Sequence, residues 1–221
     1  MGKLIVIEGL DGSGKGTQGK LLYEFLKEKY SFVRSITFPD YKSDSSAAVK
    51  MYLNGEISEN PMDVNAYAAS SFFAVDRYIS FMTEWKEDYD KGCIFLADRY
   101  TTSNAVYQVG KAEDPEAYLN WVWDYEYNKL GLPRPDLVIY LDMDPAVSAK
   151  LLLKRYNGDA GKKDIHEKNI DFLKDCRKNA MTVAKNNGWK IVSCSDDKQP
   201  FSLEEISKEV IRLAQECIEN D

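Results

Sequence analysis

The glycine-rich segment EGLDGSGKGTQ, Glu8–Gln18, restricts the possible folds of this chain more than any other feature. It follows the short apolar run KLIVIE, which is typical of a strand buried on both faces. It precedes apolar residues at helical spacing, which predict an amphipathic helix over about 16–29. The pattern Gly9, four residues, Gly14, Lys15 in this setting is typical of a phosphate-binding loop. We therefore expect a parallel α/β fold in which the loop lies between a strand and the N-terminus of a helix.

This loop has the chemistry of an anion site. Its glycines let the backbone curl so that N–H groups point inward, and the helix N-terminus adds roughly half a positive charge. The Lys15 ammonium is placed to reach the β- and γ-phosphates of a nucleotide. The residues expected to bind the nucleotide are Gly9, Leu10, Asp11, Gly12, Ser13, Gly14, Lys15, Gly16 and Thr17.

Two positions in the loop depart from the usual pattern. Gly16 stands where a Ser or Thr hydroxyl normally reaches magnesium, and the threonine comes one residue later, at Thr17. Magnesium is then held either by Thr17 after a small shift, or mainly by phosphates, water and Asp98. We favour the second, because Thr17 lies about 100° further round the helix. Asp11 is a carboxylate beside polyphosphate, so it is either exposed to solvent or, as we favour, in contact with a hydroxyl of a second substrate.

Five apolar runs alternate with helical patterns along the chain. They span residues 3–8, 31–38, 92–98, 136–144 and 188–195. This alternation predicts a doubly wound five-stranded parallel sheet with helices on both faces, and 221 residues with 44% hydrophobic content suit a single domain over 1–221. Residues 44–90 are expected to be helical with a break at NGEISENP. A terminal amphipathic helix over 202–219 starts with Ser202 and Glu205 at capping-box spacing.

The composition limits the partners. The formal net charge of −7 disfavours polymeric nucleic acid, because phosphate contacts need a basic face. No apolar run approaches the ~20 residues that a membrane span needs. The four cysteines show no CxxC spacing and the single histidine is His166, so neither a zinc site nor a disulfide framework is expected. We expect reduced thiols, no membrane contact and a cytoplasmic location.

The third apolar run ends in LADRYTTSNAVYQ, which carries a second group of candidate residues. Asp98 stands at the carboxyl end of a strand, where open α/β sheets bind ligands, so it is placed to organise magnesium directly or through water. Arg99 can clamp a phosphate with two hydrogen bonds. Asn104 and Tyr107 are three residues apart and share a helix face. The alternative is that Asp98 and Arg99 form a local ion pair while Tyr107 belongs to the core.

In combination and in this order, the segments resemble the thymidylate kinase family. The resemblance covers essentially the whole chain and rests on the loop and on FP (38–39), FFAVDR (72–77), DRYTTSNAVYQ (98–108) and PDLVIYLDMDP (135–145). It implies a P-loop NTPase fold of the nucleoside monophosphate kinase type, with a short lid at about 154–164. It also implies magnesium-dependent phosphoryl transfer from ATP to dTMP, and a homodimer formed through helices.

The resemblance also implies roles for individual residues. Phe73 matches the aromatic ring that stacks on thymine, and Arg77 and Asn104 match contacts to the base. Arg99 matches the arginine that holds the monophosphate, and Tyr107 matches the ring that crowds the 2′ position of the sugar. The set implied to bind dTMP is Asp11, Phe38, Pro39, Lys42, Phe73, Arg77, Arg99, Ser103, Asn104, Tyr107 and Gln108. The implied catalytic set is Lys15, Asp98, Arg99 and Arg155.

Acidic and basic residues around the lid complete the match. Asp11 matches a loop carboxylate near the 3′-hydroxyl of the sugar, and Asp164 and Glu167 match acidic residues after the lid. The loop carries no arginine, so the chain resembles the members that supply cations from the lid. The cations available there are Lys154, Arg155, Lys162 and Lys163. Arg155 is the best candidate, and a solvated pair is the alternative for the two adjacent lysines.

Three departures from the family pattern all concern phosphate handling. Besides Gly16, the stretch DYKS follows FP where an arginine is common, and the Lys42 point charge cannot copy a planar guanidinium. Ile165 stands where an arginine often follows the aspartate. Two alternatives therefore stay open: a deoxynucleoside monophosphate kinase of different or broader base specificity, and a regulatory nucleotide-binding protein with a degraded loop. The aromatic-rich segment 120–135 is expected to be core, with a dimer surface as the alternative.

Overall fold

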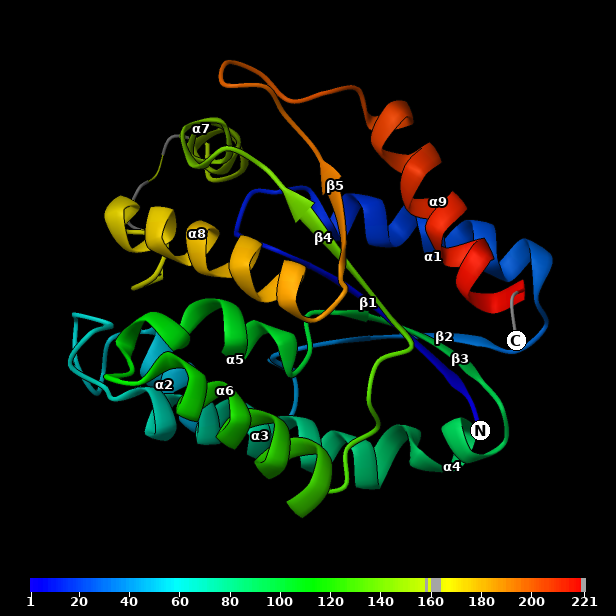
Figure 1. Ribbon diagram of the computed structural model, residues 1–221, viewed down its shortest axis with the longest axis horizontal. Helices are drawn as coiled ribbons and strands as arrows, with labels where there is room; N and C mark the ends of the chain where they lie inside the picture. Colours follow the sequence, from blue (N-terminus) through cyan, green and yellow to red (C-terminus); the bar gives the residue numbers. More distant parts are fainter. Residues whose placement is uncertain (158, 160–163, 220–221) are drawn as a thin grey trace.

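A five-stranded parallel sheet forms the centre of the computed structural model, which describes residues 1–157, 159 and 164–219 (Figure 1). The strand order is β2–β3–β1–β4–β5. The strands are β1 (Lys3–Gly9), β2 (Val33–Thr37), β3 (Ile94–Asp98), β4 (Leu137–Asp142) and β5 (Lys190–Ser193). Every strand lies within one of the predicted apolar runs or extends one by a single residue, so the predicted sheet is confirmed.

Helices connect the strands in the alternation that the sequence predicts. They are α1 (Lys15–Lys29), α2 (Ala47–Leu53), α3 (Ala66–Ser80), α4 (Lys86–Asp90), α5 (Thr102–Tyr107), α6 (Pro115–Trp123), α7 (Pro145–Arg155), α8 (Ile170–Asn186) and α9 (Leu203–Glu219). Short 3₁₀ turns are η1 (Asp44–Ser46) and η3 (Val109–Lys111), and π-helical turns are η2 (Phe81–Trp85) and η4 (Asp124–Lys129). The predicted capping box is confirmed, because the Glu205 N–H donates to Ser202 Oγ at 3.2 Å and the Ser202 N–H donates back to Glu205 Oε2 at 3.1 Å.

The sheet is buried on both faces, as its continuous apolar strands require. Alternate residues of β1 point to opposite layers: Ile5 and Ile7 pack with α1 and α9, whereas Leu4 and Val6 pack with Trp85 and its aromatic neighbours. Figure 1 shows α1 and α9 on one side of the sheet and α3, α5, α6 and α8 on the other. The expectation that the aromatic-rich segment is core is confirmed in part, because its first turns pack in a buried cluster around Val122.

The strand register brings the two sequence motifs together. β1 and β3 are adjacent and parallel, with Ile7 opposite Asp98. The Arg99 N–H donates to the Ile7 carbonyl at 3.1 Å, which carries the pairing one residue past the end of β3. The glycine loop that leaves β1 and the Asp98–Arg99 pair that ends β3 therefore meet at one edge of the sheet, where open α/β folds bind ligands.

Candidate active site

The carboxyl ends of the strands open into a cleft of about 1060 Å³ around the glycine loop. Loop residues 11–18 line this cleft together with Asp98 and Arg99. Seven of the nine residues expected to bind the nucleotide are thus on its wall. Gly9 and Leu10 are buried behind the wall, and the Leu10 side chain packs between α5 and α8.

Backbone geometry explains two of the loop glycines. Gly12 has a φ of 79°, and a Cβ there would lie 2.7 Å from the Ser148 carbonyl oxygen, so a larger residue would collide. Gly14 has a φ of 91° and is the N-cap of α1, which has no side-chain cap. The first N–H groups of this 15-residue helix therefore border the cleft without a capping side chain, which suits a bound polyphosphate.

Lys15 is buried inside the loop. Its Nζ donates to the Leu10 carbonyl at 2.9 Å and lies 3.9 Å from Asp11 Oδ1. Burial and the nearby Arg99 charge lower the pKa of Lys15, although the Asp11 carboxylate opposes that shift. The ammonium is thus held where the β- and γ-phosphates of a nucleotide in the loop would approach it.

Asp98 presents the oxygen that a magnesium ion would need. Its Oδ1 is buried and has no hydrogen-bond partner among the described residues. A Cβ at Gly16 would lie 4.0 Å from Asp98 Oδ2, so there is room for a larger residue and glycine is not required there by packing. Within the part of the chain that the structure describes, no group of three or more His, Cys, Asp or Glu side chains could hold a metal. One carboxylate beside substrate phosphates and water is a common arrangement for Mg²⁺, so the residues fit this ion.

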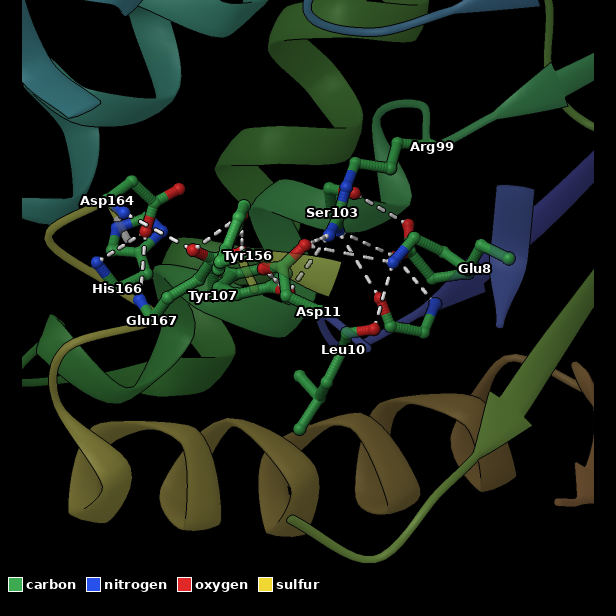
Figure 2. A network of polar contacts seen from close by, with 12 residues as sticks. Glu8, Leu10, Asp11, Arg99, Ser103, Tyr107, Tyr156, Asp164, His166 and Glu167 are labelled. Carbon is green, nitrogen blue, oxygen red and sulfur yellow. Dashed lines mark hydrogen bonds and ion pairs between the residues drawn. The ribbon is translucent and has the colours of Figure 1, made fainter. Parts of the chain in front are cut away.

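Arg99 and Asp11 form an ion pair that joins the two motifs (Figure 2). The Arg99 guanidinium also donates to the Tyr107 hydroxyl at 3.2 Å, and that hydroxyl donates to Asp11 Oδ2 at 2.9 Å. Burial alone would raise the pKa of Asp11, but Arg99 and Lys15 hold it well below its usual range. Asp11 is therefore an ionised carboxylate that is bonded to Arg99 and Tyr107 and is only partly exposed to the cleft. Among the described residues, Arg99 pairs with Asp11 and Glu8, which also rules out a local ion pair with Asp98.

Glu8 is a site residue that the sequence reasoning missed. It is fully buried, and its carboxylate accepts hydrogen bonds from the Gly9 N–H and from the Thr102 and Ser103 hydroxyls at 2.7–2.9 Å. It thereby fixes the start of the loop to the start of α5. The sequence does contain a signal for it, which is a single charged residue at the end of an apolar strand. A charged side chain at such a position is buried only when it has hydrogen-bond partners.

A smaller cavity of about 70 Å³ continues from the cleft. The two share the side chains of Phe38, Pro39 and Tyr41, together with Asp11, Arg99 and Asp164 at their junction. Ten of the eleven residues expected to bind dTMP line the smaller cavity: Asp11, Phe38, Pro39, Phe73, Arg77, Arg99, Ser103, Asn104, Tyr107 and Gln108. The eleventh, Lys42, is exposed on the surface between β2 and η1.

Arg77 is held at the floor of this cavity by a partner that the sequence did not reveal. Its Nε and Nη2 donate to the Glu126 carboxylate at 2.6 and 2.7 Å, and both side chains are 1% exposed. The Asn104 amide donates to the same carboxylate at 2.7 Å. The pair raises the pKa of Arg77 against the opposing effect of burial. Glu126 therefore orients both Arg77 and Asn104, two residues that line the smaller cavity.

The segment before α8 borders the smaller cavity with Asp164 and His166. Ile165 packs in the cluster formed by α2 and α3, and its N–H donates to the Leu53 carbonyl at 3.2 Å. An arginine could not replace it there without burying a charge. Burial and Asp11 raise the pKa of the neighbouring Asp164 to about 7. Of the expected lid cations, Lys154 is exposed, while the Arg155 side chain, Lys162 and Lys163 lie outside the described residues.

Comparison with known proteins gives one consistent result. The family model described as thymidylate kinase matches residues 7–205. A probable thymidylate kinase of Staphylothermus marinus is 35% identical over 191 residues, which cover 86% of this chain and 85% of that protein. The thymidylate kinase of Schizosaccharomyces pombe is 33% identical over 148 residues, which cover 67% of this chain and 64% of the yeast protein.

A solved structure supports the same fold. The thymidylate kinase of Ehrlichia chaffeensis superposes with a TM-score of 0.68 at 21% identity, and the match covers 97% of this chain and 99% of that one. None of the helices among the described residues is long and apolar enough to cross a membrane.

Proposed function

Because the chain belongs to the thymidylate kinase family, we propose that it transfers the γ-phosphoryl group of ATP to dTMP, giving dTDP and ADP. The observation that carries this proposal is the junction of the two cavities at Asp11 and Arg99. A nucleotide whose phosphates lie in the loop and a nucleotide whose base lies beside Phe73 and Arg77 would place their phosphate ends face to face. Positioning of this kind supplies most of the catalysis in phosphoryl transfer.

The charges at the junction suit the reaction. A phosphate oxygen of dTMP attacks the γ-phosphorus, the bond to the β-phosphate oxygen breaks, and charge spreads over the transferred group. Lys15 from the loop and Arg99 from the end of β3 would neutralise that charge, and we assign the Arg155 side chain as the lid cation. Asp98 would hold Mg²⁺ directly or through water, and the ion would neutralise the β- and γ-phosphates.

We assign the smaller cavity to the acceptor, a pyrimidine deoxynucleotide. We propose that Phe73 stacks on the base, that Arg77 and Asn104 contact its edge, and that Tyr107 lies against the sugar. The Arg77 guanidinium and the Asn104 amide keep fixed orientations because both are bonded to Glu126. A kinase of broader base specificity is the second candidate. The acceptor side departs from the family pattern at Lys42, which is exposed and supplies no arginine fork for the monophosphate.

We further propose that the protein is a cytoplasmic homodimer. Four large apolar side chains are exposed along α3: Tyr67, Val75, Tyr78 and Ile79. At 100° per residue they fall within about 120° of arc, so they form one face, here called the α3 stripe. An apolar face of this kind suits a protein contact. The buried free thiols of Cys93, Cys176 and Cys194 agree with a reducing compartment.

The decisive experiment is a steady-state assay of the purified protein with ATP, Mg²⁺ and a panel of dTMP, dUMP, dCMP, dGMP and dAMP. We expect the highest kcat/KM for dTMP. The matched variant Lys15→Met should lower kcat at least about 100-fold, which would assign the activity to this protein and not to a contaminant. Comparable kcat/KM values across the panel would favour the broader kinase. Binding of ATP without turnover of any monophosphate would overturn the enzymatic proposal.

A further inference from the structure

Three polar side chains, of which His166 lines the smaller cavity, form a chain of hydrogen bonds outside the proposed chemistry. Lys111 Nζ donates to the Tyr52 hydroxyl at 2.7 Å and to the Val64 carbonyl at 3.3 Å. The Tyr52 hydroxyl oxygen lies 2.9 Å from His166 Nε2. The three residues belong to η3, to α2 and to the segment before α8, so the bonds join parts of the fold that are distant in sequence.

The Lys111 ammonium fixes the direction of the first of these hydrogen bonds. Burial lowers the pKa of Lys111 to about 8, so at neutral pH the side chain is mostly an ammonium, which can only donate. The Tyr52 hydroxyl has one proton, and the groups within its reach are His166 Nε2, at 2.9 Å, and the Gln108 side chain. With that proton on the bond to His166, Nε2 accepts, and a neutral imidazole then carries its own proton on Nδ1. Burial and Lys111 lower the pKa of His166 to about 3, which keeps the ring neutral.

The His166 imidazole contacts Tyr107, and this contact links the three hydrogen-bonded residues to the active site. The two rings are stacked, with centroids 5.3 Å apart and planes 20° apart. Tyr107 in turn bonds Asp11 and Arg99, and the Arg99 guanidinium lies 5.1 Å from the centre of its ring. Figure 2 shows His166 on one side of Tyr107 and the Arg99–Asp11 pair on the other. Burial and the nearby Lys111 and Arg99 charges disfavour a protonated His166, so the neutral ring is the form that stacks on Tyr107.

We propose that Lys111, Tyr52 and His166 form a positioning relay that holds the Tyr107 ring, and through it the Asp11–Arg99 pair, in the geometry that binds the acceptor nucleotide. The inference rests on the proposed kinase function, because it assigns the relay to the acceptor side of that reaction. Lys111 and Tyr52 act through His166 and Tyr107, so they are positioning residues. The proposed relay therefore requires one specific tautomer of His166, which is the only histidine in the sequence.

The tautomer can be observed directly, because protein labelled with nitrogen-15 histidine contains a single labelled imidazole. Between about pH 6 and pH 8 we expect a protonated Nδ1 and an unprotonated, hydrogen-bonded Nε2. Tyr52→Phe, which keeps the ring and removes the hydroxyl, should shift the Nε2 resonance. The matched control Tyr127→Phe removes a hydroxyl bonded to Thr101 and should leave both resonances in place.

A protonated Nε2 in the wild-type protein would overturn the relay as drawn. The Tyr52 proton would then turn toward Gln108, whose carbonyl oxygen is buried and has no hydrogen-bond partner among the described residues. Resonances that do not respond to Tyr52→Phe would overturn it as well.

Kinetics test the positioning role separately. Tyr52→Phe should raise the KM for dTMP about threefold to tenfold, while kcat and the KM for ATP stay within about twofold. His166→Phe keeps a stacked ring without Nε2 and should behave like Tyr52→Phe, whereas Tyr127→Phe should match the wild type. Unchanged KM values for dTMP, or equal rises for both substrates, would overturn the proposal. A wild-type protein that leaves dTMP untouched would instead defeat the proposed function, and the labelled histidine would still report the relay.

Discussion

At the scale of single residues, the buried ion pair of Arg77 and Glu126 would tie the stability of the protein to the proposed contact between Arg77 and the base. Both charges are out of water, so each depends on the other. We expect Glu126→Gln to lower the free energy of unfolding by about 3 kcal/mol, because it leaves the guanidinium buried without a counter-charge. Urea-induced unfolding measures this difference.

The double variant Arg77→Met with Glu126→Leu should recover most of the lost stability, because two apolar side chains can replace a buried pair. Its KM for dTMP should nevertheless rise at least about tenfold, since the contact to the base is gone. As a control, Lys174→Met breaks the exposed pair with Asp171 and should change stability little. A Glu126→Gln protein as stable as the wild type would refute the structural role of the pair.

At the scale of elements, the segment 164–169 between the lid and α8 gives the protein a pH-dependent stability. The pKa of Asp164 is about 7 in the fold, well above the usual value near 3.9 of an unfolded chain. The folded state thus keeps its proton at pH values where the unfolded state has lost it. The contribution of Asp164 to the free energy of unfolding is therefore fully present below about pH 4 and is lost as the pH rises through 7.

Asp164→Asn removes the titrating group and keeps an oxygen that can accept the His166 and Glu167 N–H bonds. We expect the variant to raise the melting temperature relative to wild type by about 4 °C at pH 8 and by less at pH 5. The control Asp171→Asn, on the exposed surface of α8, should shift the melting temperature equally at both pH values. A difference between Asp164→Asn and wild type that does not grow with pH would contradict the raised pKa.

The elements themselves were predictable from the sequence, and the contacts between them were not. Apolar runs and helical spacing predicted all five strands, the long helices and the capping box of α9, because these depend on neighbouring residues. Motif positions predicted which side chains gather around the cavity. The role of Glu126 could not be predicted from the sequence, because its partner Arg77 lies 49 residues away. No local pattern distinguishes Glu126 from the other acidic residues of its segment. The contact between Tyr52 and Lys111 could not be predicted for the same reason, because the hydrogen bond between them joins residues that are 59 positions apart.

At the scale of the whole molecule, the α3 stripe would connect the proposed dimer to the acceptor site. Phe73 and Arg77 line the smaller cavity from the opposite face of the same helix, because at 100° per residue they lie about 180° from the centre of the stripe. A partner seated on the stripe would therefore hold the helix that positions the base. Disruption of the stripe should therefore abolish association and weaken acceptor binding.

Val75→Glu tests this coupling, because it would bury an unpaired charge at an apolar contact. We expect sedimentation velocity at micromolar concentration to show a dimer for the wild type and a monomer for Val75→Glu. The matched control Ile57→Glu changes an exposed isoleucine outside α3 and should stay dimeric. The Val75→Glu monomer should also have a KM for dTMP raised several-fold, with the KM for ATP nearly unchanged, because the glycine loop lies on β1 and α1 and not on α3. A dimeric Val75→Glu protein would remove the stripe from the interface. A monomer with unchanged KM for dTMP would show that the helix holds its position without a partner.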